Sequence, residues 1–146
     1  MNRSRLLFPT LVLAGASILA TSPANAGGRP LSASLSAENE VGSGGEPGAT
    51  GSAAITLNQG RGEICFVLDL SDVTAPTRAH IHEAPVGVNG PIVADFFETG
   101  DPVVTDGCTS ATSDLVKEIR KSPADYYVNV HSEAFRPGAV RGQLAP

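Results

Sequence analysis

Three histidines are the residues of this sequence whose type and spacing point most directly to chemistry. The 146-residue chain contains His80, His82 and His131 and no other histidine. His80 and His82 are two residues apart in a predicted strand, and alternate residues of a strand project from the same face. His131 ends a second predicted strand. If the two strands lie together, three neutral imidazole nitrogens converge, which is a ligand set for copper or zinc.

Charged residues near the predicted strands could complete such a site. Glu83, Asp95 and Glu133 are candidates for a carboxylate ligand or for a hydrogen-bond partner of a ring. Arg141 is a candidate to pair with an acidic side chain or to attract an anion toward the histidines. An alternative interpretation is that the histidines are hydrogen-bonded structural residues that anchor loops at one end of the domain.

The elements that would position these side chains are predicted from alternating apolar and polar residues and from β-branched enrichment. Seven such segments, separated by turns, predict an all-β fold, an antiparallel Greek-key sandwich or barrel of about seven to eight strands. The predicted strands cover residues 31–37, 51–57, 63–70, 77–82, 91–96, 126–131 and 139–144.

One short helix interrupts this pattern over residues 113–121. Ser113 is the predicted N-cap, and Pro123 follows the predicted end. Leu115 and Ile119 are four residues apart and form a narrow apolar stripe. We expect this stripe to close one end of the β structure.

The first 26 residues have the features of an export signal. Two arginines precede an apolar run of about 15 residues, which is short for a membrane span of about 20. The sequence Ala24-Asn25-Ala26 then forms a small-x-small cleavage site. We therefore predict a cleaved signal peptide at residues 1–26 and a single domain at residues 27–146. The protein is expected to be periplasmic or secreted, with no integral membrane segment after cleavage.

Export bears on the two cysteines, Cys65 and Cys108. In an oxidising compartment such a pair forms one disulfide, which here closes a loop of about 44 residues. By restricting the unfolded chain, a loop of this length stabilises the fold by roughly 3 to 4 kcal/mol. The alternative is a reactive thiol or a metal-binding thiolate pair.

The composition excludes several classes of protein. A net charge of −5 provides no basic surface for nucleic acid or an anionic membrane. Two cysteines are too few for a cysteine-only tetrahedral zinc site. With 5% aromatic residues, 16 Gly and 11 Pro, the chain is typical of a turn-rich β domain rather than of a helical bundle.

Four motifs, in this order, resemble the CHRD domain, which is named after chordin. Together they cover nearly all of the chain after residue 26. The resemblance implies a small exported β domain of a family without an established general biochemical activity. The motifs are Leu35-Ser36-Ala37-Glu38-Asn39-Glu40-Val41, the segment from Ala79 to Val93, Tyr127-Val128-Asn129-Val130-His131-Ser132, and Pro137-Gly138 with Arg141-Gly142-Gln143-Leu144.

A weaker resemblance concerns the segment from His80 to Glu83. It is similar to the His-x-His copper-ligand strand of copper/zinc superoxide dismutases, which are exported Greek-key proteins with one intrachain disulfide. Three histidines are too few for the two-metal site of that family. The resemblance therefore implies at most a copper-only centre with three histidines, toward which Arg141 would guide an anionic oxidant.

Three functions remain open at this point. The first is a non-enzymatic exported domain that binds a copper or zinc ion through the three histidines. The second is a structural module of the cell envelope that binds a protein or a glycan without a metal. The third is a copper-dependent, superoxide dismutase-like enzyme. No paired carboxylates or Ser-His-Asp set can be placed, so an activity would have to depend on a metal.

Overall fold

The computed structural model describes residues 28–42, 44–100 and 103–146. The predicted signal peptide lies outside these residues. The described chain forms eight strands, one α-helix and two 3₁₀ turns. In chain order these are β1 (Arg29–Ser36), η1 (Ala37–Asn39), β2 (Thr50–Asn58), β3 (Glu63–Ser71), β4 (Pro76–Glu83), β5 (Ile92–Phe97), β6 (Asp106–Ser110), α1 (Ser113–Lys121), η2 (Pro123–Asp125), β7 (Tyr126–Ser132) and β8 (Val140–Gln143).

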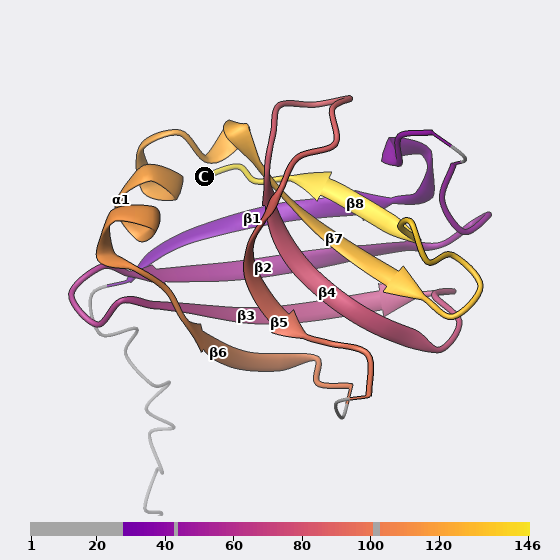
Figure 1. Ribbon diagram of the computed structural model, residues 1–146, viewed down its shortest axis with the longest axis horizontal. Coiled ribbons are helices and arrows are strands. Elements are labelled where there is room, and N and C mark those ends of the chain that lie inside the picture. The colour runs from indigo at the N-terminus through magenta and orange to yellow at the C-terminus, as the bar shows by residue number, and fades with distance from the viewer. Residues whose placement is uncertain (1–27, 43, 101–102) are drawn as a thin grey trace, which may run out of the picture.

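All eight strands belong to one antiparallel sheet in the order β5-β4-β7-β8-β1-β2-β3-β6. The edge strands β5 and β6 contact each other, so the sheet closes almost completely into a barrel (Figure 1). β4, β5 and β6 follow one another around the barrel, and β7 returns to the free side of β4, which is a Greek-key connection. The predicted all-β antiparallel fold with one short helix is confirmed.

The core fills the inside of this barrel because the strands alternate. On β3, Ile64, Phe66 and Leu68 are buried inside, whereas Cys65 and Val67 face outward. Burying each large apolar side chain contributes about 1.5 to 3 kcal/mol to folding. The strand predicted over residues 63–70 is therefore confirmed, with one face in the core.

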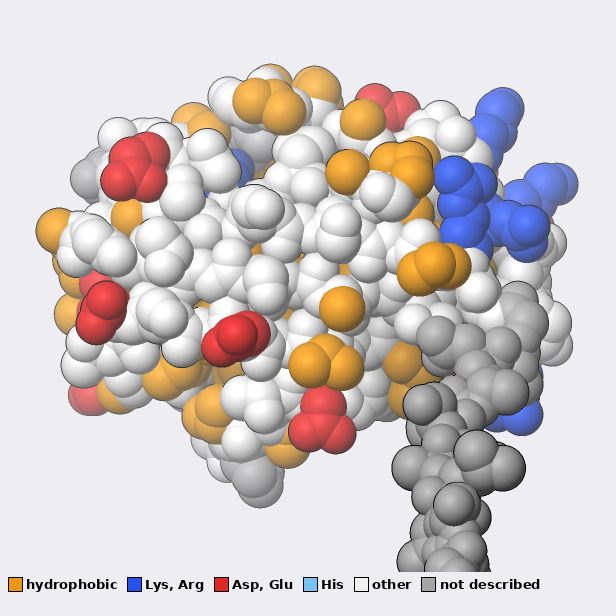
Figure 2. Space-filling view, turned by 180° about the vertical axis from the view of Figure 1, so that it is seen from behind, with side chains coloured by type: hydrophobic (Ala, Val, Ile, Leu, Met, Phe, Trp, Pro, Cys, Tyr) orange, Lys and Arg blue, Asp and Glu red, His pale blue; other side chains and the backbone are white. Residues whose placement is uncertain are grey.

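The two sides of the barrel differ in how their outer faces are covered. The side formed by β1, β2 and β3 is open to solvent, and Figure 2 shows few charged side chains on that face of the molecule. All seven residues of β7 are buried, by contrast, although the strand has an outer face as well. Loops cover that outer face, because Gly90, Ala84 and Arg136 all supply carbonyl oxygens to side chains of β4, β7 and β8.

The helix α1 packs at one end of the barrel (Figure 1), where Val116 and Ile119 are fully buried. Its N-cap is Thr112, whose hydroxyl accepts a hydrogen bond from the Leu115 amide at 3.1 Å. The prediction that Ser113 caps the helix is wrong, because the Ser113 hydroxyl donates to the Gln59 carbonyl. No helix in the described part of the chain is long and apolar enough to cross a membrane.

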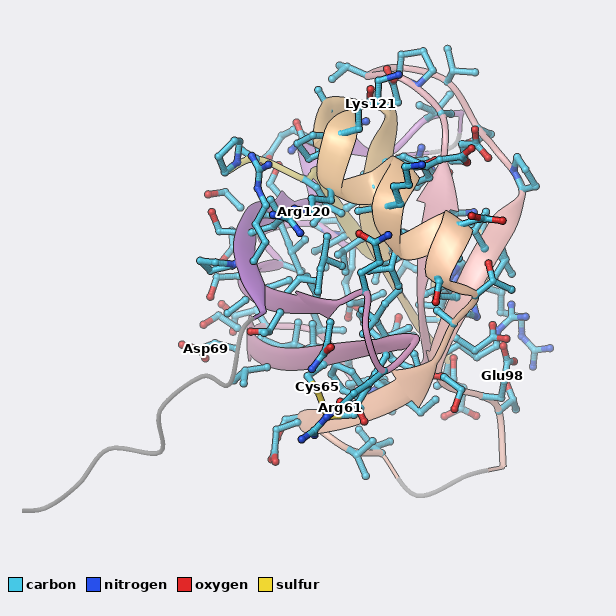
Figure 3. All side chains as sticks on the ribbon, turned by 90° about the vertical axis from the view of Figure 1, so that its left-hand side faces the viewer. Arg61, Cys65, Asp69, Glu98, Arg120 and Lys121 are labelled. Atoms are coloured by element: carbon cyan, nitrogen blue, oxygen red, sulfur yellow. A yellow bond between two sulfur atoms is a disulfide. The ribbon has the colours of Figure 1, made fainter. Side chains whose placement is uncertain are left out.

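The eighth strand, β6, was absent from the sequence prediction. Its five residues, Asp106–Ser110, show no apolar alternation, since this edge strand contributes no fully buried side chain. Its position is fixed by pairing with β3, in which Cys65 lies directly opposite Cys108. These cysteines form a disulfide (Figure 3), so the structural interpretation of the pair is confirmed and the free-thiol alternative is wrong.

Candidate metal centre

The pairing of β4 with β7 brings the three histidines together. His80 and His82 alternate on β4, and His131 lies on β7 opposite Arg78. Because Arg78 is two residues before His80, His131 projects from the same outer face as the other two rings. The ring centroid of His80 lies 5.0 Å from that of His131 and 5.5 Å from that of His82. The predicted convergence of the histidines is confirmed.

Two of the rings are oriented by backbone carbonyls from the covering loops. His82 Nδ1 lies 3.0 Å from the Gly90 carbonyl oxygen, and His131 Nδ1 lies 2.8 Å from that of Arg136. A carbonyl oxygen can only accept, so each Nδ1 donates its proton. The proton-free nitrogen of both neutral rings is therefore Nε2.

The third ring is oriented by a carboxylate. His80 Nε2 lies 2.9 Å from Glu98 Oε1, and Asp95 Oδ1 lies 3.9 Å from the same nitrogen. A carboxylate accepts the Nε2 proton, which leaves Nδ1 of His80 as the nitrogen with a free lone pair. Outer partners of this kind fix the orientation and raise the basicity of histidines that bind metals.

The remaining nitrogens of the three rings are buried and have no hydrogen-bond partner. They are His80 Nδ1, His82 Nε2 and His131 Nε2, three of the four such side-chain atoms within the described residues. One nitrogen of each ring lies within 4.8 Å of the others. A buried polar atom without a partner costs about 1 to 3 kcal/mol. Three clustered rings that each keep such an atom could hold a metal ion.

Burial keeps these rings neutral. The side chain of His80 is fully buried, and His82 and His131 are 8% and 6% exposed. Desolvation lowers the pKa of His131 to about 4, and it also lowers the pKa of His80 and of His82. At neutral pH the three imidazoles therefore carry free lone pairs, the state that coordinates a metal ion.

The carboxylates proposed from the sequence take different positions. Asp95 lies at the His80 edge of the cluster, within the group that also contains Glu98. Glu83 is exposed at the end of β4 and lines a hollow with Tyr126 and residues of α1. Glu133 is also exposed, in the turn after β7. Of the three, Asp95 is thus the one that the structure brings within 4 Å of a histidine nitrogen.

Arg141 belongs to a second polar cluster on the same outer face. Its Nε and Nη2 donate to Glu40 Oε2 at 2.8 and 2.7 Å, and Nη2 also donates to Asn89 Oδ1 at 2.7 Å. Asn129 donates to the other oxygen of Glu40 and to the Val140 carbonyl. We name Glu40, Asn129 and Arg141 the arginine cluster.

An aromatic residue joins the two clusters. The ring of Tyr127 stacks on that of His82, with a centroid distance of 4.8 Å and an interplanar angle of 4°. The guanidinium of Arg141 lies over the same tyrosine ring, 4.6 Å from its centroid. Arg141 therefore reaches the histidines through Tyr127, while its hydrogen bonds hold Glu40 and a covering loop.

A comparison with family models places this geometry in context. The model of the CHRD domain matches residues 31–144, from β1 to the residue after β8. The chain belongs to the CHRD domain family. No curated protein and no solved structure gives a significant match. The CHRD resemblance of the motifs is confirmed, whereas the superoxide dismutase resemblance has no counterpart in these comparisons.

Sequence reasoning missed several residues that build the site of this CHRD domain. Glu98 follows β5 directly, and no periodic pattern distinguishes it from other exposed acidic residues. Tyr127 and Glu40 do lie in the family motifs, so the motifs could have identified them as candidate site residues. Their partners, His82 and Arg141, are 45 and 101 residues away in the chain.

Proposed function

We propose that this CHRD domain binds one transition metal ion, copper or zinc, through His80, His82 and His131. Two observations support this most strongly: one nitrogen of each ring lies within 4.8 Å of the others, and each ring has one buried nitrogen without a hydrogen-bond partner. Structural histidines use their polar atoms on protein partners, because leaving them unbonded costs free energy. Here one nitrogen of each ring is hydrogen-bonded to a protein group, and the other is available to bind a shared ligand.

The donor set favours these metals over others. Neutral imidazole suits copper and zinc, whereas magnesium and calcium prefer oxygen ligands. The disulfide removes both thiolates as ligands, so the ligand atoms that we propose from the protein are all histidine nitrogens. Three histidines leave a fourth position for water or another ligand, as in zinc sites that remain open. Metal–nitrogen bonds of about 2.0 to 2.1 Å require the three rings to close slightly around the ion.

Titration of tag-free protein with Zn(II) and Cu(II) tests this proposal. Calorimetry and elemental analysis should give one ion per chain, and His82→Ala or His131→Ala should abolish stoichiometric binding. Glu83→Ala is the matched control, because Glu83 adjoins His82 in the chain but lies away from the cluster. Wild-type protein that binds no ion, or a His80→Ala, His82→Ala double variant that binds as tightly, would contradict the proposal and favour the envelope module without a metal.

We also infer that the domain functions outside the cytoplasm. The Cys65–Cys108 disulfide is typical of exported proteins, and the sequence of residues 1–26 has the features of a signal peptide. Expression of the full chain in a bacterial host tests this inference. The intact mass of the protein recovered outside the cytoplasm should correspond to a chain that begins at residue 27 and contains no free thiol. Full-length protein retained in the cytoplasm would contradict it.

A further inference from the structure

A second polar hollow lies beside the histidine cluster, and its lining contains none of the three histidines. It has a volume of about 360 Å³ and is formed by the start of β4, the segment after β5 and the turn after β7. Figure 1 places these segments at the end of the barrel opposite α1. The residues that line the hollow are Thr77, Arg78, Thr99, Glu133 and Arg136.

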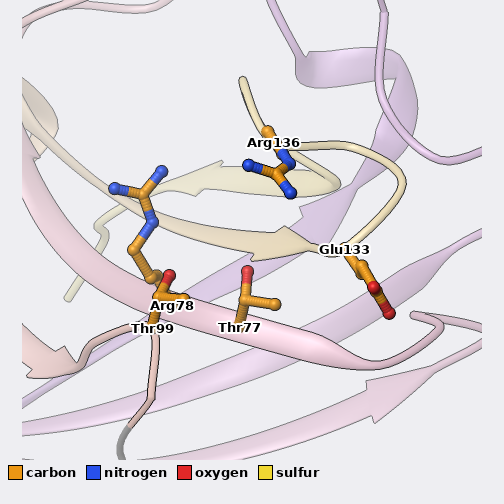
Figure 4. Close-up of a pocket in the computed structure, with 5 residues that line it drawn as sticks. All are labelled: Thr77, Arg78, Thr99, Glu133 and Arg136. Atoms are coloured by element: carbon orange, nitrogen blue, oxygen red, sulfur yellow. The ribbon is translucent and has the colours of Figure 1, made fainter.

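The side chains around this hollow present donors from several directions. In Figure 4 the guanidinium groups of Arg78 and Arg136 approach from two sides, and the hydroxyl of Thr77 points between them. The carboxylate of Glu133 is turned away from both arginines in the same view. The hollow is therefore bordered by two positive charges and by hydrogen-bond donors, with Glu133 as the carboxylate of its lining and Glu98 interacting electrostatically with Arg78.

Neither arginine has an acidic partner within 4.0 Å among the described residues, whereas Arg141 is held by Glu40. Arg78 is half-buried and is fixed on β4 opposite His131. Arg136 lies in a turn whose backbone is tied to β7 by the hydrogen bond to His131. Two guanidinium groups at one hollow, neither in an ion pair within the described residues, match a carboxylate or phosphate group, whose oxygens can accept from both at once.

We propose that this hollow binds a small oxyanion, a carboxylate or phosphate group, between Arg78 and Arg136, with the Thr77 hydroxyl as a further donor. Glu133 stands at the rim and opposes the charge of the ligand, which keeps the affinity moderate. The site does not require a metal ion, because its donors all come from the protein. It gives this CHRD domain a means of recognising an acidic small molecule or an acidic group on a larger partner.

An NMR titration of metal-free, ¹⁵N-labelled protein at low salt tests the proposal. Inorganic phosphate and malonate serve as probes, and comparison of the two distinguishes phosphate from carboxylate recognition. Amide shifts should be confined to residues 77–78, 99 and 133–136. Because the protein is free of metal, the outcome is independent of whether the histidines bind an ion.

Substitutions then assign the donors. Arg136→Ala and Arg78→Ala should each weaken the binding about tenfold or more, as expected for a lost charged hydrogen bond. Arg120→Ala is the matched control, since Arg120 is exposed on α1, at the end of the barrel opposite the hollow (Figure 1). Glu133→Gln should tighten binding because it removes the opposing charge.

Several outcomes would overturn the proposal. Wild-type protein that shows no saturable shift with either probe has no such site. Shifts that gather around Arg120 and Lys121 would mean that the anion binds the basic end of α1 instead. Unchanged affinity in the Arg136→Ala variant, whose exposed side chain can be removed without disturbing the core, would exclude the two-arginine arrangement.

Discussion

The histidine cluster and the arginine cluster are neighbours on the outer face of β4, β7 and β8, yet they use their polar atoms in opposite ways. In the arginine cluster, both oxygens of Glu40 are occupied, one by Arg141 and one by Asn129. In the histidine cluster, each ring leaves one buried nitrogen without a partner. Loops bury both clusters, so exposure to water does not explain the difference.

The comparison shows how a buried polar cluster can indicate its role. A group of side chains that satisfies itself stabilises the fold and has nothing left to bind. A cluster with several buried, unsatisfied polar atoms lowers the free energy of unfolding. A ligand that bonds to those atoms restores that stability. The arginine cluster is therefore structural, and the binding role stays our proposal for the histidine cluster.

The largest expected effect comes from breaking the arginine cluster. Arg141→Met leaves Glu40 as a buried carboxylate without its cation, and Glu40 is 3% exposed as a side chain. Loss of one partner of such a pair costs about 3 to 5 kcal/mol. Urea denaturation should show this decrease in the free energy of unfolding. A loss below about 1 kcal/mol would mean that the two clusters do not differ in the way described.

The next largest effect is the stabilisation of the histidine cluster by its ligand. An ion that binds only the folded chain adds about 2.7 kcal/mol at a free concentration 100 times its dissociation constant. The melting temperature in excess Zn(II) should therefore rise for the wild type and stay constant for His82→Ala. An equal rise in both proteins would place the ion elsewhere.

A smaller effect is expected when a histidine is replaced in the metal-free protein. His131→Leu removes the hydrogen bond to the Arg136 carbonyl but also removes the partnerless Nε2. The two contributions are similar in size and oppose each other, so stability should change by about 1 kcal/mol or less. Denaturation without metal, beside Arg141→Met, measures the contrast directly. A loss as large as that of Arg141→Met would indicate a structural role for His131.

The last comparison concerns a pH dependence that the histidines impose on the metal-free protein. The pKa of His131 is about 4 in the folded state and about 6.5 in the unfolded state. The unfolded chain therefore binds more protons between these values, and the free energy of unfolding should fall as the pH drops from 6.5 to 4. Burial raises the pKa of Glu40, which acts with the opposite sign and is present in every variant compared.

Denaturation midpoints measured across this pH range test the point. The slope should be smaller in His131→Leu than in the wild type, because the substitution removes one proton-binding site. Glu83→Ala is again the control, since Glu83 lies outside the cluster. Identical slopes in wild type and His131→Leu would show that His131 is not held neutral by burial.

Strand prediction succeeded where each strand carries its own pattern. β3 has a large apolar residue at every second position from Ile64 to Leu70, so its inner face could be assigned from the chain alone. β6 could not be predicted, because it is an edge strand whose place depends on pairing with β3. The predicted N-cap was wrong by one residue. The Ser113 hydroxyl donates to the carbonyl of Gln59, 54 residues away in the chain, and the helix is capped by Thr112 instead.

Some features of the candidate site could likewise be predicted from the sequence, and others could not. The two-residue spacing of His80 and His82 on a strand determined that both rings share a face. The predicted export to an oxidising compartment led to the prediction that the two cysteines form a disulfide. The approach of His131, the carboxylate of Glu98 and the pairing of Arg141 with Glu40 all required the folded chain. Apolar alternation can be recognised in consecutive residues. Contacts across the barrel depend instead on the register between strands and on the loops that bury the outer face. The sequence by itself therefore determined which residues could bind a ligand, and only the tertiary structure decided which of their atoms remain free to do so.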